Sequence, residues 1–145
     1  MSAATDLFSE ADRAQLVAAI AAAESHTSGE IRVHVENWCW FGPQWRARRV
    51  FRKLGMHNTK ARTGVLIYVA VRSHKLAIIG DSGINQVVPA GFWNQTLQQL
   101  REDFRAKRFT QGLITAVDHC SSQLATHFPG SADNPDELSN EISFG

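Results

Sequence analysis

At 145 residues the chain has the length of a single domain, and its 43% content of hydrophobic residues is typical of a folded globular protein. A net charge of +1 gives no reason to expect a polyanionic partner from composition alone. The first residues lack the basic and apolar regions of a signal peptide, and no apolar run approaches the ~20 residues that span a bilayer. The two cysteines, Cys39 and Cys120, have no metal-binding spacing, which favours a cytoplasmic protein with reduced thiols.

Charge is unevenly distributed along the chain. Residues 37–80 contain nine cations and no acid, whereas residues 1–36 contain six acids and two cations. Residues 129–145 contain four acids and no cation. The sequence therefore predicts a basic middle between acidic ends. The acidic segments either lie against the basic one within the fold or leave it available to an anionic partner.

The first helix and the first strand are predicted within residues 9–36. Ser9 suits a helix N-cap, and the helix is predicted to end at residues 27–29, with Gly29 in a left-handed turn. Its apolar positions recur at helical spacing: Leu16, Ile20 and Ala23. Residues 30–36 then alternate between apolar and polar side chains, which predicts a strand with one buried face, at a sheet edge or beside a cleft.

A second helix and two further strands are predicted next. Pro43 suits the first turn of a helix that Gly55 closes. Residues 64–71 are apolar throughout and rich in Val and Ile, which predicts a strand covered on both faces. The intervening helix makes this strand parallel to the first one. The short turn at residues 72–74 then makes residues 75–79 an antiparallel hairpin partner.

Two more helices complete the predicted domain. One begins at Pro89 and the other is capped by Thr110. Their apolar stripes are Trp93, Leu97, Leu100 and Phe104 in the first, and Leu113, Val117, Cys120 and Leu124 in the second. Together these elements predict an α/β/α sandwich with about four helices and a small mixed sheet, made of a parallel pair plus an antiparallel hairpin strand. We expect one domain over residues 1–128 and an acidic, turn-rich tail over residues 129–145.

An acidic loop, Gly80-Asp81-Ser82-Gly83, follows the hairpin strand. The predicted strand directions bring Asp81 to the same sheet edge as Glu30 and Arg62. Oxygen atoms of Asp81, Asn85 and Glu30 would suit a hard cation such as Ca²⁺ or Mg²⁺. The alternative is structural: Asp81 caps the helical turn that follows, and Glu30 pairs with Arg62.

The loop at residues 38–41, Trp-Cys-Trp-Phe, is unusually apolar. Its aromatic side chains either fold onto Trp45 as a small satellite core or form an exposed patch for a partner. The next helix places cations opposite its apolar stripe, so the two segments would form one surface. The binding residues would then be Trp38, Trp40, Phe41, Arg46, Arg49 and Lys53. Such a surface suits a protein partner or an anionic surface, whereas the balanced total charge and the lack of a known motif argue against nucleic acid.

Several segments together carry a family resemblance. The longest are Thr27–Val35 (Thr-Ser-Gly-Glu-Ile-Arg-Val-His-Val), Thr63–Val69 (Thr-Gly-Val-Leu-Ile-Tyr-Val) and Ala77–Ile84 (Ala-Ile-Ile-Gly-Asp-Ser-Gly-Ile). Shorter ones are Phe92-Trp93, Gly112-Leu113 and residues 136–145. These segments resemble the TPM domain family, the domain of thylakoid acid-phosphatase-like proteins and their bacterial relatives. The chain is most similar to the short stand-alone bacterial form, without signal peptide or membrane anchor, and the resemblance implies an α/β/α sandwich.

The resemblance also implies a candidate chemistry, because some plastid members are described as acid phosphatases and some members bind divalent cations such as calcium. Asp81 matches one acidic position implied for metal binding. The family usually has an Asp beside the proline before the second helix and a Gly-Asp before the position of Phe109. This chain has Gly42 and Lys107-Arg108 there, which weakens an inherited metal site.

Two functions follow from these observations. We expect an uncharacterised TPM-type domain that acts as a non-catalytic binding module and requires no cofactor. The alternative is a weak divalent-cation-dependent phosphatase, with Asp81 holding the cation and Arg62 binding phosphate.

Overall fold

The computed structural model describes residues 3–59, 62–88, 91–130 and 140–145. The helices are α1 (Glu10–Glu24), α2 (Pro43–Lys53), α3 (Ser82–Asn85), α4 (Asn94–Arg105) and α5 (Phe109–His127), with short 3₁₀ turns η1 (Thr5–Leu7) and η2 (Met56–Asn58). The strands are β1 (Glu30–Glu36), β2 (Gly64–Ala70), β3 (Lys75–Gly80) and β4 (Ser143–Phe144).

The four strands form one mixed sheet in the order β3-β2-β1-β4. β1 and β2 are parallel, with Glu30 opposite Gly64, and β3 is antiparallel to β2, with Val65 opposite Gly80. The predicted α/β fold with a parallel pair and an antiparallel hairpin strand is therefore confirmed. The fourth strand was not predicted: Ser143 and Phe144 pair in parallel with β1 beside His34 and Val35.

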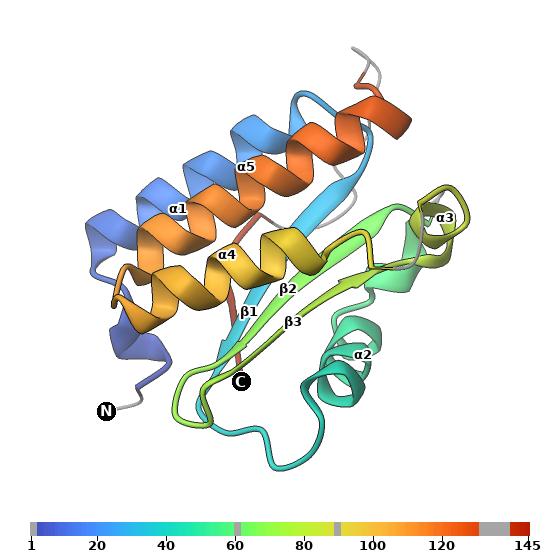
Figure 1. Cartoon of the computed structure of the whole chain (residues 1–145). Coiled ribbons are helices and arrows are strands. Elements are labelled where there is room, and N and C mark those ends of the chain that lie inside the picture. Colours follow the sequence, from blue (N-terminus) through green and yellow to red (C-terminus); the bar gives the residue numbers. More distant parts are fainter. Residues whose placement is uncertain (1–2, 60–61, 89–90, 131–139) are drawn as a thin grey trace.

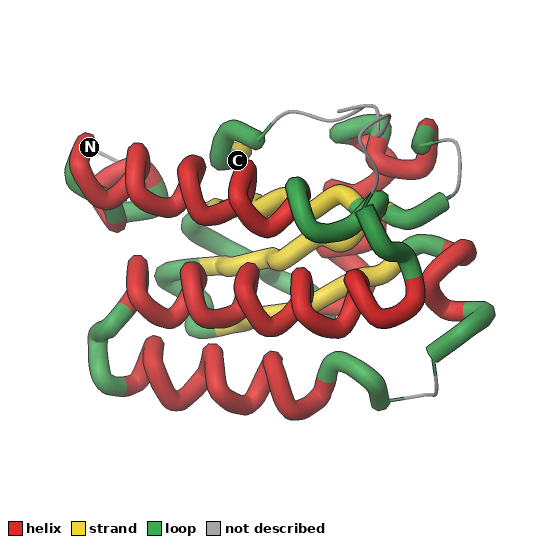
Figure 2. Tube along the Cα trace, turned by 90° about the horizontal axis from the view of Figure 1, so that it is seen from above, coloured by secondary structure: helices red, strands yellow, loops and turns green. Residues whose placement is uncertain are grey.

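Helices cover both faces of the sheet, as Figure 1 shows, with α1, α4 and α5 on one side and α2 on the other. Figure 2 shows the three helices of the first side running next to one another. β2 is buried along its whole length because its side chains alternate between the two layers. Ile67 belongs to the core beneath α1, α4 and α5, whereas Leu66 and Tyr68 belong to the smaller core beneath α2.

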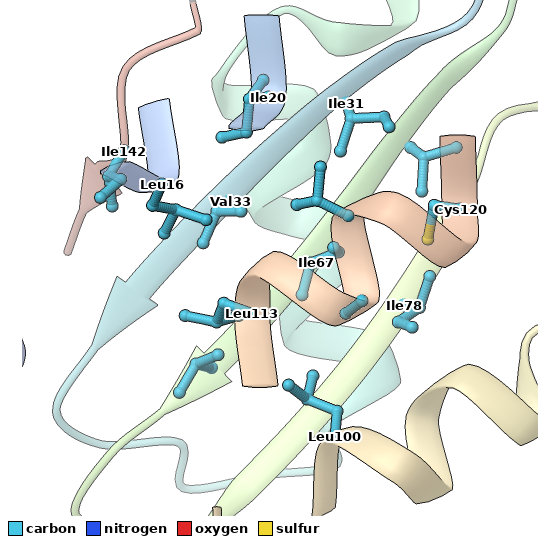
Figure 3. Close-up of a cluster of buried hydrophobic side chains, with 14 of the residues drawn as sticks. Leu16, Ile20, Ile31, Val33, Ile67, Ile78, Leu100, Leu113, Cys120 and Ile142 are labelled. Carbon is cyan, nitrogen blue, oxygen red and sulfur yellow. The ribbon is translucent and has the colours of Figure 1, made fainter. Parts of the chain in front are cut away.

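The larger core contains the apolar stripes predicted for the helices of its own layer, α1, α4 and α5. Leu16 and Ile20 of α1 are fully buried against Ile31 and Val33 of β1 (Figure 3). The predicted stripe of α5 is likewise buried: Leu113, Val117, Cys120 and Leu124. Ile142, next to β4, is 7% exposed and lies in the same cluster. The last described residues thus contribute to the main core.

Two helix boundaries differ from the predictions. α1 ends at Glu24, and Gly29 does not have the left-handed conformation expected of a C-cap. A Cβ atom on Gly29 would lie 3.0 Å from Leu124 of α5, so this glycine permits close packing instead. α5 begins at Phe109 with Arg108 as its N-cap, which places Thr110 inside the helix. The predicted start of the third helix at Pro89 lies outside the described residues, and α4 begins at Asn94.

Candidate binding surface

The connection between β1 and α2 carries an exposed group of aromatic side chains. Trp40 is 74% exposed, Phe41 68%, Trp45 50% and Trp38 48%. We call these four residues the aromatic patch. In Figure 1 this connection extends along the lower end of the molecule, next to the β2–β3 turn. Large hydrophobic side chains are rarely left this accessible in one place unless they contact a partner.

The aromatic rings of the patch contact one another but remain exposed to solvent. Trp38 and Trp40 are stacked, with ring centroids 5.1 Å apart and planes inclined by 10°. Phe41 meets Trp45 edge to face at 5.5 Å. The predicted contact with Trp45 therefore exists, but all four side chains remain about half exposed or more, so they do not form a closed satellite core.

The backbone of the loop is held in place by the β2–β3 hairpin. The Nζ atom of Lys75 donates to the carbonyl oxygens of Cys39 and Phe41, at 3.1 and 3.0 Å. The amide of Cys39 donates to Ser73 Oγ at 2.8 Å. Cys39 is only 4% exposed, so it points inward between two exposed tryptophans. These bonds fix the loop with its aromatic rings turned outward.

Two of the predicted cations on α2, Arg46 and Arg49, lie beside the patch and have different surroundings. Arg46 is engaged by Glu36, through bonds of 2.8 Å from Nε to Oε2 and from Nη2 to Oε1. Arg49 lies over the ring of Trp45, 5.0 Å from its centroid. Arg46 and Arg49 also line a pocket of about 450 Å³ with the aromatic patch and Cys39. Lys53 is exposed at the end of α2.

A buried polar network, which was not predicted from the sequence, lies behind this surface. Tyr68 donates to Glu36 Oε2, and His34 Nε2 lies 3.1 Å from Glu36 Oε1. His34 Nδ1 is 2.9 Å from Ser143 Oγ of β4. The signal in the sequence is the polar face of residues 30–36, together with one tyrosine in an otherwise apolar strand. The parallel register places His34 opposite Tyr68 and so brings these groups together.

The network fixes the protonation of its members. Burial by itself would raise the pKa of Glu36, but hydrogen bonds from Arg46, Tyr68 and His34 outweigh it and lower that pKa to about 2. Burial lowers the pKa of His34, which favours a neutral imidazole. Burial and the bond to Glu36 raise the pKa of Tyr68, and the bond to Glu36 raises that of Arg46. At neutral pH, Glu36 and Arg46 thus form an ion pair that compensates both charges.

The second candidate site lies at the other end of the sheet, where the predicted residues do come together. The amide of Glu30 donates to the carbonyl of Thr63, and the amide of Asp81 to that of Gly64. Arg62 Nη1 lies 3.9 Å from Asp81 Oδ2. Asp81 Oδ1 accepts from the amide of Ser82 at 2.7 Å, so Asp81 caps α3 as the structural alternative predicted. Arg62 thus faces the carboxylate of Asp81.

The Asp81 site is a poor match to a metal centre. Asp81 Oδ2 is buried and accepts no hydrogen bond within the described part of the chain, but the guanidinium group of Arg62 faces it. Asn85 uses its Nδ2 atom to donate to Gly80 O at 2.9 Å. Among the described residues, no group of three or more His, Cys, Asp or Glu side chains lies close enough to hold a metal ion. A cation here would meet the positive charge of Arg62 with few carboxylates to offset it.

Gly42 and Lys107-Arg108, the positions where the family usually has acidic residues, do not surround Asp81. Gly42 is the N-cap of α2, and Arg108 at the start of α5 pairs with Asp103 at 3.0 Å. The connection between α4 and α5 lies at the opposite end of the molecule from α3 in both Figure 1 and Figure 2. Carboxylates at 107–108 would therefore have been remote from the loop that begins α3.

The fold and the patch define a class of protein: an α/β/α sandwich domain that presents a hydrogen-bonded aromatic loop beside a basic helix. The model of the TPM domain family matches residues 1–123. The chain belongs to the TPM domain family, as the sequence resemblance predicted. No curated protein matches the chain. Within the described residues, no helix is long and apolar enough to cross a membrane.

Solved structures agree with this assignment. The solution structure of the BA42 protein from the psychrophilic bacterium Bizionia argentinensis is 43% identical, covers 95% of each chain and superimposes with a TM-score of 0.89. The N-terminal domain of a protein from P. gingivalis is 18% identical with a TM-score of 0.70, over 84% of this chain and 79% of that one. The N-terminal domain of cg2496 from Corynebacterium glutamicum is 12% identical with a TM-score of 0.65, over 88% and 80%. At these lower identities the likeness concerns the fold alone.

Proposed function

We propose that this TPM domain is a non-catalytic binding module whose binding surface is the aromatic patch together with the exposed cations of α2. The observation that carries the proposal is the accessibility of the patch: four aromatic side chains, 48–74% exposed, on a loop held by hydrogen bonds. Aromatic and arginine side chains contribute most of the binding energy in many interfaces. A preformed loop also lowers the entropic cost of binding.

The charges favour an anionic partner, either an acidic protein or another anionic surface. Arg48, Arg49, Arg52 and Lys53 are exposed, and none of them is in an ion pair between described residues. The acid next to this region, Glu36, is buried and already compensated by Arg46. The two free cysteines support a cytoplasmic location. Nothing in this surface requires a cofactor.

A double substitution tests the proposal. Trp40→Ala with Arg49→Glu removes the most exposed ring and reverses one charge, so we expect loss of binding to an acidic probe such as a polyglutamate peptide. The thermal midpoint should stay nearly unchanged, because both side chains are exposed. The matched control is Val87→Ala with Arg101→Glu, an exposed pair elsewhere on the surface. Unfolding of the first variant alone, or full retention of binding, would contradict the proposal.

The alternative, a weak divalent-cation-dependent phosphatase at the Gly80–Gly83 loop, is favoured by one observation. The buried Oδ2 atom of Asp81 accepts no hydrogen bond from the described residues, and Arg62 beside it is half exposed. A cation would give Asp81 Oδ2 a partner, and Arg62, which already donates to the carbonyl oxygen of His57 at 2.8 Å, would contact the phosphate group.

Calcium separates the two proposals. Under the binding proposal no ion binds at this loop, so Ca²⁺ or Mg²⁺ should change the thermal midpoint little. A bound ion at a hundredfold excess over its Kd would instead stabilise the fold by about 2.7 kcal/mol. A large shift at micromolar Ca²⁺ that disappears in Asp81→Asn would favour the phosphatase. Hydrolysis of p-nitrophenyl phosphate that is lost in both Asp81→Asn and Arg62→Ala would establish it.

A further inference from the structure

We propose that the partner of the aromatic patch is the surface of an anionic lipid membrane. This inference rests on the proposed function and specifies its partner. The patch would enter the interface between headgroups and acyl chains, and the cations of α2 and of the β2–β3 turn would contact the lipid phosphates.

The composition of the patch suits a lipid interface. Tryptophan prefers the boundary between water and hydrocarbon, because its ring is apolar and its N–H group is polar. Three of the four patch residues are tryptophans. Two of them, Trp38 and Trp40, are exposed on either side of the buried Cys39. Membrane affinity grows with the apolar area that such a segment can bury.

The backbone of the loop is also prepared for an environment poor in water. Polar backbone groups that enter the apolar part of a membrane must be satisfied within the protein. Lys75 occupies the carbonyl oxygens of Cys39 and Phe41, and Ser73 accepts from the amide of Cys39. These three backbone groups would therefore keep their partners on insertion. An interface with an acidic protein, which stays wet and polar at its rim, has no need of this arrangement.

Cations lie on two elements that are connected to the patch, with Arg49 lining its pocket. On α2, exposed Arg48, Arg49, Arg52 and Lys53 have no acidic partner among the described residues. On the β2–β3 turn, Arg72 is exposed, and its amide donates to the carbonyl of Asn37 at 2.8 Å, which ties the turn to the start of the aromatic loop. Each basic residue near an anionic membrane adds about 1 kcal/mol to binding, or about fivefold in affinity.

The pocket at the patch joins both properties. Its walls are the aromatic rings, and Arg46 and Arg49 line it as well. Because Arg46 is already paired with Glu36, Arg49 is the residue available to an anion. The guanidinium group can bind a phosphate, and the apolar wall beside it can contact an acyl chain. A phospholipid carries both groups, whereas inorganic phosphate has no acyl chain.

Vesicle flotation of the full chain tests the proposal. We expect binding to vesicles of phosphatidylglycerol mixed with phosphatidylcholine, little binding to phosphatidylcholine alone, and weaker binding as salt increases. Trp40→Ala with Phe41→Ala should weaken binding by about tenfold or more, and so should Arg49→Glu with Lys53→Glu. The second variant changes only exposed charged side chains on α2, so it remains informative even if the first variant is less stable. Val87→Ala with Arg101→Glu serves as the control and should bind like the parent.

A second readout locates the contact. Lipids brominated near the headgroup should quench part of the tryptophan fluorescence of the parent, and less of it in Trp40→Phe. Absence of vesicle binding, with polyglutamate binding still dependent on Trp40 and Arg49, would overturn the membrane inference and leave the proposed function intact. Absence of both would overturn the two together. Vesicle binding that is unchanged in the patch and charge variants would also overturn the inference, because the contact would then lie elsewhere.

Discussion

Glu36 shows how a single buried carboxylate organises the region behind the patch. Its two oxygens receive bonds from Arg46, Tyr68 and His34, which come from α2, β2 and β1. A buried charge is costly unless such donors compensate it. Here the compensation fixes the start of α2 against the sheet and therefore fixes the loop that precedes it. The network acts as structural support, in which hydrogen bonds keep Glu36 ionised and burial keeps His34 neutral.

Glu36→Gln should make the free energy of unfolding less dependent on pH. The pKa of Glu36 is about 2 in the folded state against 4.5 as the ordinary value, so its ionised form stabilises the fold above about pH 4.5. That contribution is lost as pH falls toward 2. At neutral pH the variant should lose about 2–3 kcal/mol. Urea denaturation from pH 2.5 to 7 checks this: the gap between parent and variant should narrow as pH falls. A gap that is constant across this range would contradict the assigned ionisation.

At the scale of elements, β2 holds the two layers together. Its odd and even positions contribute to different cores, so every side chain from Gly64 to Ala70 is buried. This was predictable, because a run of apolar β-branched residues without alternation indicates a strand covered on both faces. β4 was not predictable: it has two residues, it lies in the segment predicted to be a tail, and only its pairing with β1 makes it a strand.

Leu66→Ala should destabilise the domain by about 2–5 kcal/mol, through lost burial and a residual cavity. Leu66 is fully buried beneath α2, so the surrounding structure has little freedom to collapse into the space. Chemical denaturation measures the change, and Val87→Ala, at a half-exposed position, is the control and should stay within about 0.5 kcal/mol. A loss below about 1 kcal/mol for Leu66→Ala would mean that β2 is not packed on both faces.

At the scale of the whole molecule, the two candidate sites lie at opposite ends of the sheet, and the chain directions explain why. Parallel β1 and β2 bring Glu30 and Arg62 to one end, and the returning β3 adds Asp81 there, as predicted. The loop after β1 leaves from the other end and carries the aromatic patch. The location of each site thus followed from the sequence. Whether the aromatic side chains would be buried or exposed did not, because an apolar loop is compatible with both outcomes until its neighbours are known.

The polar network was missed for a related reason. His34 and Glu36 were recognised as the polar face of a strand, but their burial depends on what covers that face. The cover includes Tyr68 and Arg46, whose contacts depend on strand register and on the position of α2. Long-range pairings of this kind are decided by tertiary packing, and local sequence patterns do not report them.

Amide chemical-shift mapping of the ¹⁵N-labelled chain would show directly whether the aromatic patch and α2 form the binding surface. The chain would be titrated separately with anionic bicelles, with a polyglutamate peptide, and with Ca²⁺ plus phosphate. We expect the largest shifts at residues 38–41 and 45–53 with at least one of the first two probes, and we expect them to be absent in Trp40→Ala with Arg49→Glu. Largest shifts at residues 80–85, or an effect of Ca²⁺ plus phosphate alone, would contradict this expectation and identify the Asp81 edge as the working site.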